Sequence, residues 1–405
     1  MEEPIFKFKK AKHSLDIVYP NKYYGGLYNL GILIVYNSVN KREDWNCNRV
    51  FLDQGKIASE LVGFSFQYEL DIKNILEMKK QCKGFTFAGG PVINMNPEKF
   101  RKHFDFLILG EVEGVLDKVL DEYEKGEGFL DRISNIKGVY VDKVSYNFTK
   151  ELGDYPLIQP FPEKVDETFV FGKCFILEIE RGCPYNCKFC ALPGFFEKIR
   201  YRKNWKEIID RGLEINKRDR VVIYSASFTH PERKEILKHL IKKQVRASVP
   251  SIRVGMIDKE TISLIKQLGQ KSLTIAPEAN EKLRLSMGKM VKDKDYLDFV
   301  EICNEVGFTK LKLYLMIGVP GMEEKDIIEM KEFVDKIKEK FNGKIYVSVN
   351  YFVPKPKSKF QDHPFDKKIL KQQTKIVERE FKHYRVKMKG LKTSYLEWDI
   401  SKIDS

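Results

Sequence analysis

Short apolar runs alternate with amphipathic segments over the first third of the chain. Runs rich in β-branched and aromatic residues predict five strands, at 14–20, 48–52, 60–66, 84–90 and 105–111. Longer segments with helical character lie among them, at 26–39, 71–82, 97–104 and 113–126. Strands separated by helices imply a parallel doubly wound sheet, so residues 1–151 are expected to form an α/β, Rossmann-like domain.

A second α/β series begins after a segment, 152–164, that carries three prolines and no periodicity, which we expect to be a linker. The strands of the second series are predicted at 173–180, 220–226, 246–249, 271–276, 310–318 and 344–352. Its helices are predicted at 204–219, 231–243, 257–269, 293–307 and 324–341. Six strands with right-handed helical crossovers predict a partial six-stranded (β/α) TIM-type barrel over 165–355. The remaining residues, 356–405, are predicted to be a basic C-terminal tail.

Composition narrows the class of protein. A length of 405 residues suggests two or three domains, and 42% hydrophobic with 32% charged residues is typical of a soluble globular chain. No run of eighteen apolar residues and no secretory leader are present, so we expect a cytoplasmic protein without a membrane partner. The excess of 72 basic over 58 acidic residues gives +14, which admits nucleic acid or an anionic cofactor as a partner.

Three of the seven cysteines stand together. Cys183, Cys187 and Cys190 form a C-x3-C-x2-C pattern directly after the first barrel strand, where barrel enzymes place their chemistry. Three thiolates on one loop can hold three irons of a [4Fe–4S] cluster and leave the fourth iron open. Zinc would need a fourth ligand, and Cys174 lies inside the strand. A buried apolar cluster is the other alternative, but Pro, Asn and Lys among the cysteines favour a loop.

With Phe189 before the last cysteine, this pattern resembles the radical SAM superfamily. The resemblance implies a [4Fe–4S] cluster whose open iron binds S-adenosylmethionine, and one-electron cleavage to methionine and a 5′-deoxyadenosyl radical that abstracts a substrate hydrogen. The stretches at 248–253, 274–279, 312–321 and 350–361 are similar to those of the branch with an N-terminal cobalamin-binding domain. The resemblance runs from about Asp16 to Gln361.

The barrel residues expected to contact these cofactors follow the predicted strands. Arg253 is suited to the methionine carboxylate, and Glu278 to the methionine ammonium or the ribose hydroxyls. The backbone at Gly318 can approach adenine or ribose closely. The alternatives are a solvated surface pair for Arg253 and Glu278, and a plain turn for the glycine. The full expected set in the barrel is Phe189, Ser225, Ser248, Ser251, Arg253, Glu278, Gly318 and Asn350.

In the N-terminal domain, the stretches at 64–68, 88–98 and 108–114 resemble the cofactor-facing loops of that branch, which binds cobalamin. Residues expected there, at strand ends of an open parallel sheet, are Ser65, Gln67, Gly89, Gly90, Pro91, Gly110, Glu111 and Glu113. The Asp-x-His-x-x-Gly motif that supplies a lower cobalt ligand is missing, and His13 and His103 are expected at the surface. Cobalamin would therefore bind without a protein histidine on cobalt, or the site is a decayed one.

Two further features leave alternatives open. His230, after the second barrel strand, is either a catalytic general base or a cap for the following helix. Lysines after the last barrel strand, interleaved with Phe360, Tyr384 and Tyr395, suit either RNA or simply a solvated helix face. These lysines are Lys355, Lys357, Lys359, Lys367 and Lys368.

The function expected from these observations is that of a radical SAM enzyme, with cobalamin-dependent C-methylation of an unactivated carbon on a protein or other substrate. The first alternative is a cobalamin-free radical SAM enzyme that modifies tRNA, another RNA or a peptide. The second is a zinc- or cluster-bearing nucleic-acid-binding protein without enzymatic activity. A low-potential electron donor is an expected partner, and nothing in the sequence decides between a protein, peptide or RNA substrate.

Overall fold

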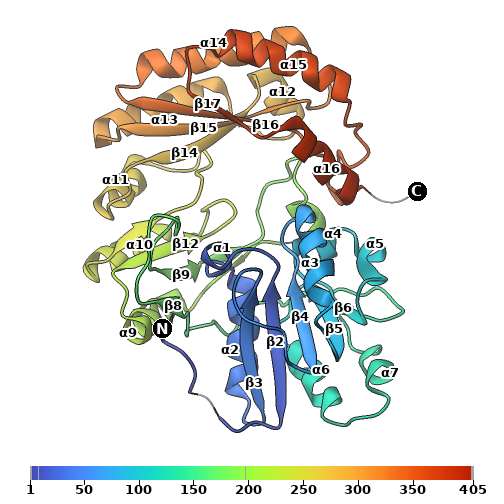
Figure 1. The fold of residues 1–405 in the computed structure, drawn as a ribbon. Helices are drawn as coiled ribbons and strands as arrows, with labels where there is room; N and C mark the ends of the chain where they lie inside the picture. Colours follow the sequence, from blue (N-terminus) through green and yellow to red (C-terminus); the bar gives the residue numbers. More distant parts are fainter. Residues whose placement is uncertain (1, 8, 197, 403–405) are drawn as a thin grey trace. The chain divides into compact units, whose positions relative to one another are not determined.

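The structure is a computed structural model that describes residues 2–7, 9–196 and 198–402 (Figure 1). The chain forms two compact units. Unit 1 holds the chain up to Ile176 together with Glu207–Arg218, and unit 2 holds Leu177–Lys206 and Asp219–Lys402. No helix among the described residues is both long enough and apolar enough to cross a bilayer.

Unit 1 is built on a six-stranded sheet with the strand order β3-β2-β4-β5-β6-β7. The first five strands run parallel, and β7 is antiparallel to β6. This confirms the predicted doubly wound α/β sheet, to which the structure adds β7. The strands are β2 (His13–Tyr19), β3 (Trp45–Phe51), β4 (Leu61–Ser65), β5 (Phe85–Gly89), β6 (Phe106–Ile108) and β7 (Val139–Tyr140).

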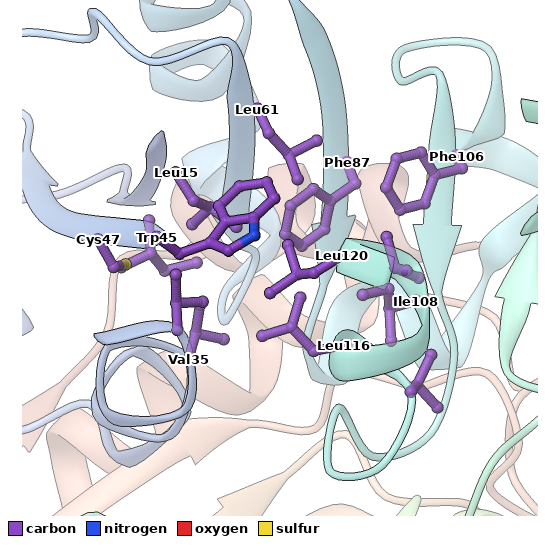
Figure 2. Close-up of a cluster of buried hydrophobic side chains, with 14 of the residues drawn as sticks. Leu15, Val35, Trp45, Cys47, Leu61, Phe87, Phe106, Ile108, Leu116 and Leu120 are labelled. Carbon is purple, nitrogen blue, oxygen red and sulfur yellow. The ribbon is translucent and has the colours of Figure 1, made fainter. Parts of the chain in front are cut away.

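Helices cover both faces of this sheet because its strands are apolar on both sides. On one face, α2 (Leu30–Lys41), α6 (Leu116–Tyr123) and α7 (Phe129–Ile133) bury an apolar cluster around Trp45 and Phe106 (Figure 2). On the other face, Phe66 packs edge-on against Phe100 at 5.0 Å between ring centroids. The remaining helices of this part are α1 (Tyr23–Gly26), η1 (Glu69–Asp71), α3 (Ile72–Lys79), α4 (Pro91–Met95) and α5 (Pro97–Arg101).

The proline-containing segment 152–164 packs tightly within unit 1. Its short strand β8 (Phe161–Pro162) pairs antiparallel with β1 (Glu2–Glu3). Gln159 is fully buried, and its side chain exchanges hydrogen bonds with the backbone of Ile176 at 2.7 and 2.9 Å. These buried contacts make the segment part of the core packing of the unit.

The six predicted barrel strands, together with β17, form two hydrogen-bonded sheets, β13-β12-β9 and β14-β15-β16-β17, and all of these strands lie in unit 2 except the first two residues of β9. The parallel pairs and the helices between successive strands give the partial TIM-type barrel. The strands are β9 (Phe175–Glu178), β12 (Arg220–Tyr224), β13 (Arg246–Ser248), β14 (Leu273–Glu278), β15 (Lys310–Ile317) and β16 (Lys344–Tyr351). The barrel helices of unit 2 are α8 (Leu192–Phe195), α10 (Arg233–Lys242), α11 (Lys259–Gln267), α12 (Glu281–Ser286), α13 (Asp293–Val306) and α14 (Glu324–Lys340), whereas α9 (Trp205–Asn216) belongs to unit 1 except for its first two residues. A short hairpin, β10 (Glu180–Arg181) with β11 (Arg200–Tyr201), flanks the loop after β9.

The alternation along β15 separates two environments. Leu311, Leu313, Leu315 and Ile317 are fully buried, whereas the residues between them are half-buried. Since side chains alternate across a strand, the half-buried set faces the inside of the barrel and supplies candidate site residues.

The C-terminal segment is not the tail expected for 356–405. It forms α15 (Lys367–Glu380), β17 (Val386–Met388) and α16 (Leu391–Ser401), and β17 extends the barrel sheet as a parallel neighbour of β16. The many lysines concealed the apolar positions, of which Leu370, Val377 and Phe381 are buried.

Candidate functional site

The three clustered cysteines lie on one loop that follows β10. Gly182 begins the loop with a φ of +92°, and a Cβ there would lie 3.2 Å from the carbonyl oxygen of Lys198. Glycine is therefore required at the entry to the loop. Cys187 is buried, and Cys183 and Cys190 are half-buried, so the thiols lie at the boundary between core and solvent.

A second segment of the barrel packs directly onto this loop. The Lys188 amide donates to the Met287 carbonyl at 2.8 Å. A Cβ at Gly288 would lie 3.1 Å from the Asn186 carbonyl oxygen, so that position also needs a small residue. Phe189 packs against a buried apolar cluster that includes Met287. Phe189 thus anchors the loop. This packing role is not the direct contact with a cofactor that the sequence analysis predicted for it.

The thiols influence one another electrostatically. Burial raises the pKa of Cys190, and the neighbouring charges of Cys187, Cys183 and Glu278 raise it further, against a backbone hydrogen bond from Leu192. Within the part of the chain that the structure describes, no three Cys, His, Asp or Glu side chains lie close enough together to hold a metal as they stand.

Arg253 connects the loop after β13 to the cysteine loop. Its guanidinium lies 3.6 Å from the centroid of the Tyr185 ring, and Nη1 donates to the Sγ of Cys187 at 3.7 Å. A hydrogen bond of 2.9 Å from the Ile252 amide to the Thr274 carbonyl holds this loop against β14. Of the two serines predicted nearby, Ser248 ends β13 half-buried, and Ser251 is exposed on the loop.

A buried carboxylate, Glu180, lies three residues before the first cysteine, and the sequence analysis missed it. Glu180 is 2% exposed and accepts hydrogen bonds from Ser225, from Ser227 at 3.2 Å and from the Thr229 amide at 3.0 Å. Ser225, predicted to bind cofactor, is therefore engaged with this carboxylate. The sequence feature that could have pointed to Glu180 is its position directly before the cysteine motif.

The structure assigns His230 to the capping alternative. Its Nδ1 accepts from the Glu232 amide at 3.1 Å, and its Nε2 lies 3.3 Å from the Arg202 carbonyl oxygen. The ring is 3% exposed, and burial lowers its pKa. Because both ring nitrogens are occupied, the prediction of a general base at His230 is wrong for this conformation.

Glu278 occupies an irregular turn at the end of β14. Its φ is +67°, which is strained for a residue with a side chain, and the register with β15 shifts between Ile275 and Glu278. Lys289 pairs with the Glu278 carboxylate at 2.8 Å and also donates to the Ala276 carbonyl. The pair is largely buried, so the surface alternative for Glu278 is wrong.

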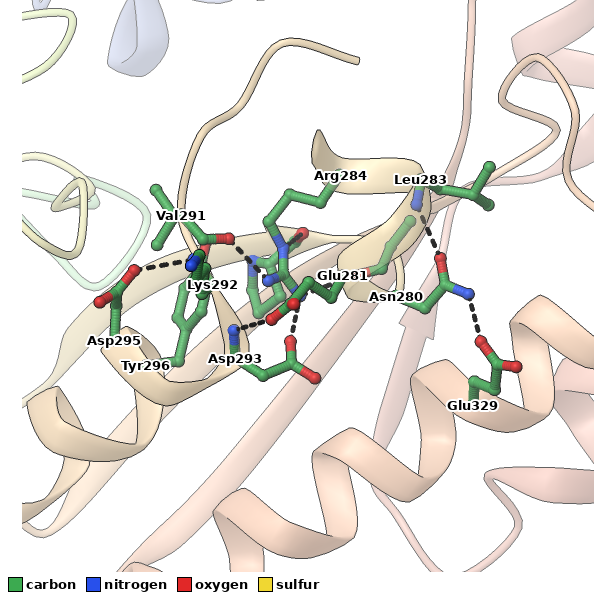
Figure 3. A network of polar contacts seen from close by, with 12 residues as sticks. Asn280, Glu281, Leu283, Arg284, Val291, Lys292, Asp293, Asp295, Tyr296 and Glu329 are labelled. Atoms are coloured by element: carbon green, nitrogen blue, oxygen red, sulfur yellow. Dashed lines mark hydrogen bonds and ion pairs between the residues drawn. The ribbon is translucent and has the colours of Figure 1, made fainter. Parts of the chain in front are cut away.

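A fully buried arginine supports this turn (Figure 3). Arg284 donates to the carbonyls of Pro277 at 2.8 Å, Ala279 at 3.0 Å and Val291 at 2.9 Å. The same guanidinium pairs with Asp293 at 2.8 Å. These contacts satisfy backbone oxygens on both sides of Glu278 and fix the position of its carboxylate.

Gly318 and Asn350 lie near the ends of the next two strands. A Cβ at Gly318, which has a φ of +79°, would lie 2.4 Å from Leu370 of α15. Packing and turn geometry therefore both demand glycine there. Asn350 lines a cavity of about 620 Å³ together with Glu278, on the inner side of β14, β15, β16 and β17.

In unit 1, the strand order places a topological switch between β2 and β4, because the chain leaves β2 toward β3 on one side and β4 on the other. Ligands of open α/β sheets bind beyond the carboxyl ends of the strands at such a switch. Ser65 lies there, and its hydroxyl accepts from Asn29 at 3.4 Å and from Gln67 at 3.1 Å. Gly90, with a φ of +112°, approaches the Phe66 carbonyl so closely that a Cβ would lie at 2.7 Å. Sequence analysis found Ser65, Gln67 and Gly90 but missed Asn29.

The residues after β6 that were predicted to bind cobalamin contact another segment of the same chain. A Cβ at Gly110 would lie 2.0 Å from the Asn147 carbonyl oxygen, and the Asn147 side chain donates to the carbonyls of Glu111 and Glu113 at 3.0 and 3.1 Å. The Glu111 carboxylate accepts from the amide and hydroxyl of Thr149, both at 2.8 Å. Gly110 and Glu111 therefore hold a neighbouring segment in place, and their predicted direct contact with a cofactor does not fit this arrangement.

Gly89 and Pro91 form the turn into α4. The Gly89 carbonyl accepts from the Phe66 amide at 2.9 Å, and Pro91 begins the helix. The two histidines of unit 1 lie at the opposite edge of the sheet. His13 begins β2, where it stacks on Trp45 at 4.9 Å, and His103 precedes β6.

Two sequence profiles match the chain over these two regions. The profile described as the radical SAM superfamily matches residues 177–334, which include the cysteine loop. The profile for the N-terminal part of radical SAM proteins matches residues 57–142.

This chain belongs to the radical SAM superfamily.

Relatives and a solved structure agree with that membership. An uncharacterized protein of Methanocaldococcus jannaschii is 31% identical over 92% of this chain and 85% of its own length. The hopanoid C-3 methylase of Methylococcus capsulatus is 21% identical over 57% of this chain and 49% of that protein. The ribosomal protein uS12 methylthiotransferase RimO of Prochlorococcus marinus is 23% identical over 67% of this chain and 59% of that protein. The chain thus spans only about half to three fifths of the two named enzymes.

The solved structure of the cobalamin-dependent S-adenosylmethionine radical enzyme OxsB, in its apo form, shares the fold. Its TM-score is 0.56 at 13% identity, over 79% of this chain and 51% of that protein. At that identity the match concerns the fold alone.

As a radical SAM enzyme, the protein uses a [4Fe–4S] cluster and S-adenosylmethionine. The donor chemistry of the cysteine loop fits the cluster, since it offers three thiols on eight consecutive residues and a cation, Arg253, beside one of them. Because each thiolate of such a cluster binds a different iron, Cys183, Cys187 and Cys190 need not converge on a single metal ion.

Proposed function

We propose that this radical SAM enzyme methylates an unactivated carbon atom and uses cobalamin as the methyl carrier. The observation that carries the proposal is the parallel sheet of unit 1, whose switch point presents Ser65, Gln67 and Asn29. The fold similarity to a cobalamin-dependent radical enzyme extends over 79% of the chain. The similarity to the hopanoid C-3 methylase supports methyl transfer as the outcome.

When bound, the cluster and S-adenosylmethionine supply a 5′-deoxyadenosyl radical that removes a substrate hydrogen atom, and cobalamin supplies the methyl group. Cys183, Cys187 and Cys190 hold the cluster in this proposal. Arg253 binds the carboxylate of S-adenosylmethionine, and Glu278, held by Lys289, binds its ammonium or ribose. Rigid placement of these groups and exclusion of water are the contributions of the protein chain.

The neutral amides and hydroxyl at the switch point suit a corrinoid, whose periphery carries many amide groups. Both histidines of unit 1 lie at the opposite sheet edge, so no unit 1 histidine serves as a lower cobalt ligand in this proposal. Of the residues predicted for cobalamin, Ser65, Gln67, Gly89, Gly90 and Pro91 remain candidates.

Anaerobic expression with a cobalamin supply tests the proposal. The purified protein is expected to carry about one corrinoid per chain and to release 5′-deoxyadenosine when reduced with S-adenosylmethionine. A protein that cleaves S-adenosylmethionine yet takes up no corrinoid would contradict the cobalamin part and leave the radical SAM part standing.

The similarity to a methylthiotransferase favours one competing activity, sulfur insertion into a ribosomal protein or an RNA. A second cluster for sulfur insertion would need further cysteines, but the four that remain, Cys47, Cys82, Cys174 and Cys303, are far apart along the chain, and all except Cys82 are buried. About four irons per chain after reconstitution is the expected result, and about eight would favour sulfur insertion.

Three of the lysines predicted for RNA are in contact with groups of the protein itself. Lys355 pairs with Glu397 at 2.8 Å, Lys367 lies 3.1 Å from the Tyr395 ring centroid and Lys357 lies 5.4 Å from that of Phe195. We propose that these lysines serve mainly to fasten α15 and α16 to the barrel.

A further inference from the structure

The barrel cavity carries more positive charge than its own carboxylates balance. Three lysines line it: Lys312 from β15, and Lys387 and Lys389 from the C-terminal segment. Glu278 also lines it but is already paired with Lys289 at 2.8 Å. The charge of the cavity therefore depends on the partners of the three lysines.

Among the described residues, only one of these lysines has a carboxylate partner. Lys389 pairs with Glu397. Within the described chain, neither Lys312 nor Lys387 has a carboxylate within ion-pair distance. Two ammonium groups that line one cavity with no counter-ion among the described residues repel one another, with Lys312 half-buried and Lys387 exposed to solvent.

The strand register aligns polar groups with these two lysines. Tyr314, Ser348 and Lys387 occupy equivalent positions on β15, β16 and β17, so their side chains emerge side by side on the inner face. Lys312 precedes Tyr314 by two residues on the same face, and its ammonium lies 4.8 Å from the Tyr314 ring centroid. Ser348, which is 6% exposed, is thus the register neighbour of Lys387, and Lys312 lies one register step of two residues away on the adjacent strand.

We propose that Lys312, Lys387 and Ser348 form a binding site for the anionic group, a carboxylate or a phosphate, of a small-molecule substrate. A volume of about 620 Å³ is that of a small-ligand pocket and is too small to enclose a macromolecule. Lysine suits either anion because its ammonium acts as a point charge with three donors. This inference rests on the proposed function, since it names the substrate class for the same barrel.

Calorimetric titration of the reconstituted full-length protein tests this site with two probes, inorganic pyrophosphate and succinate. At least one is expected to bind, and the preferred probe identifies the anion. Lys312→Met and Lys387→Met are each expected to weaken binding about 10-fold, and the double variant more strongly. Lys371→Met, which removes an exposed lysine from α15, is the matched control and should change the dissociation constant less than twofold.

Several results would overturn the site. Failure of both probes to bind, or equal weakening in Lys371→Met, would mean that the cavity has no specific anion site. A parallel loss of S-adenosylmethionine affinity in Lys312→Met would assign the cations to the cofactor. Binding of an RNA oligonucleotide or an acidic peptide without binding of either small anion would contradict the small-molecule assignment.

Release of 5′-deoxyadenosine without substrate separates this inference from the proposed function. In the unmodified protein this release requires the cluster and S-adenosylmethionine but not the anion site. Intact release with no anion binding would refute the anion site alone. Absent release in the unmodified protein would instead refute the proposed function.

Discussion

Arg253 lies flat against Tyr185, with 3.6 Å between its guanidinium carbon and the ring centroid, while the same side chain reaches the Sγ of Cys187. One aromatic ring thus orients the cation that we assign to the carboxylate of S-adenosylmethionine. Both residues of this stack come from loops that follow barrel strands, so only folding brings them together.

The stack predicts the order of S-adenosylmethionine affinities. Arg253→Gln should weaken binding about 10- to 100-fold, because a charge-assisted contact is lost. The affinity of Arg253→Lys for S-adenosylmethionine should lie between those of the parent and of Arg253→Gln, since lysine keeps the charge but not the planar stack. Tyr185→Phe should bind S-adenosylmethionine nearly as tightly as the parent, because the aromatic ring remains. Tyr185→Leu should bind it more weakly, because the ring is lost. Equilibrium dialysis at matched iron content measures this, and equal affinity in Arg253→Gln would remove Arg253 from the cofactor site.

Each of the three loop cysteines should be essential for the cluster. Cys183→Ala, Cys187→Ala and Cys190→Ala are expected to lose most of the iron and all 5′-deoxyadenosine release, because each supplies one of three protein ligands. Iron and sulfide analysis after anaerobic reconstitution measures this. Cys82→Ala, which alters a half-buried cysteine of unit 1, should keep both iron and activity. A full cluster in any loop variant would contradict the assignment.

Arg284 should dominate the stability of the turn that holds Glu278. Arg284→Met removes a fully buried cation and leaves Asp293 and three carbonyls without it, so we expect a loss of about 3 to 5 kcal/mol in the free energy of unfolding. Denaturant unfolding followed by a probe in unit 2 measures it. Arg379→Met, at an exposed ion pair, should cost less than about 1 kcal/mol. Comparable losses in the two variants would show that burial of Arg284 carries no special weight.

Gly318 and Leu370 should be energetically coupled. Gly318→Ala adds a Cβ 2.4 Å from Leu370 at a φ of +79°, and overpacking together with backbone strain should cost about 2 to 4 kcal/mol. Adding Leu370→Ala should relieve the overpacking but not the strain. A double-mutant cycle should therefore give less destabilisation than the sum of the two single changes, and strict additivity would refute the contact.

Asp71 should make unit 1 less stable as pH rises. Burial raises its pKa to about 6, with Glu69 raising it further and a hydrogen bond from Asn21 opposing the shift. Since the folded pKa exceeds the unfolded one, the folded state binds the extra proton between about pH 4 and 6, and stability falls as pH rises through that window.

Asp71→Asn should therefore stabilise the protein at pH 7 by about 1 to 3 kcal/mol, and the gain should vanish below about pH 4. Denaturant unfolding from pH 4 to 8 measures this difference. Asp154→Asn, at a carboxylate that is 94% exposed, provides the control and should show no such trend. A gain in Asp71→Asn that does not change with pH would contradict the assignment.

The hydrophobic pattern alone was enough for most of the architecture. All six barrel strands and the five strands β2 to β6 of unit 1 lie where period and β-branched content predicted them, because each buried strand needs a continuous apolar stretch. The pattern failed where polar residues masked it. The strand Val386–Met388 and the helices beside it lie among lysines whose long stems cover apolar surface, and so looked like a solvated tail.

The residues of the candidate site also fall into two groups, those that the sequence revealed and those that only the structure revealed. A local motif revealed Cys183, Cys187 and Cys190, because three cluster ligands must lie on one short loop. Arg284 and Lys312 carry no local signature, and the one local hint of Glu180 is its position just before the cysteine motif. Their importance depends on burial and on partners from distant strands, as with Ser225 and Thr229 around Glu180.

By itself, then, the sequence determined the superfamily, the α/β architecture and the three candidate cluster ligands, since these depend on periodicity and spacing along the chain. Tertiary structure alone decided that His230 is a cap, that Glu111 holds Thr149, and that Lys312 and Lys387 share one cavity in which the described residues give them no counter-ion. The physical reason is that hydrogen-bond satisfaction and charge balance depend on neighbours in space, which the order of residues does not reveal.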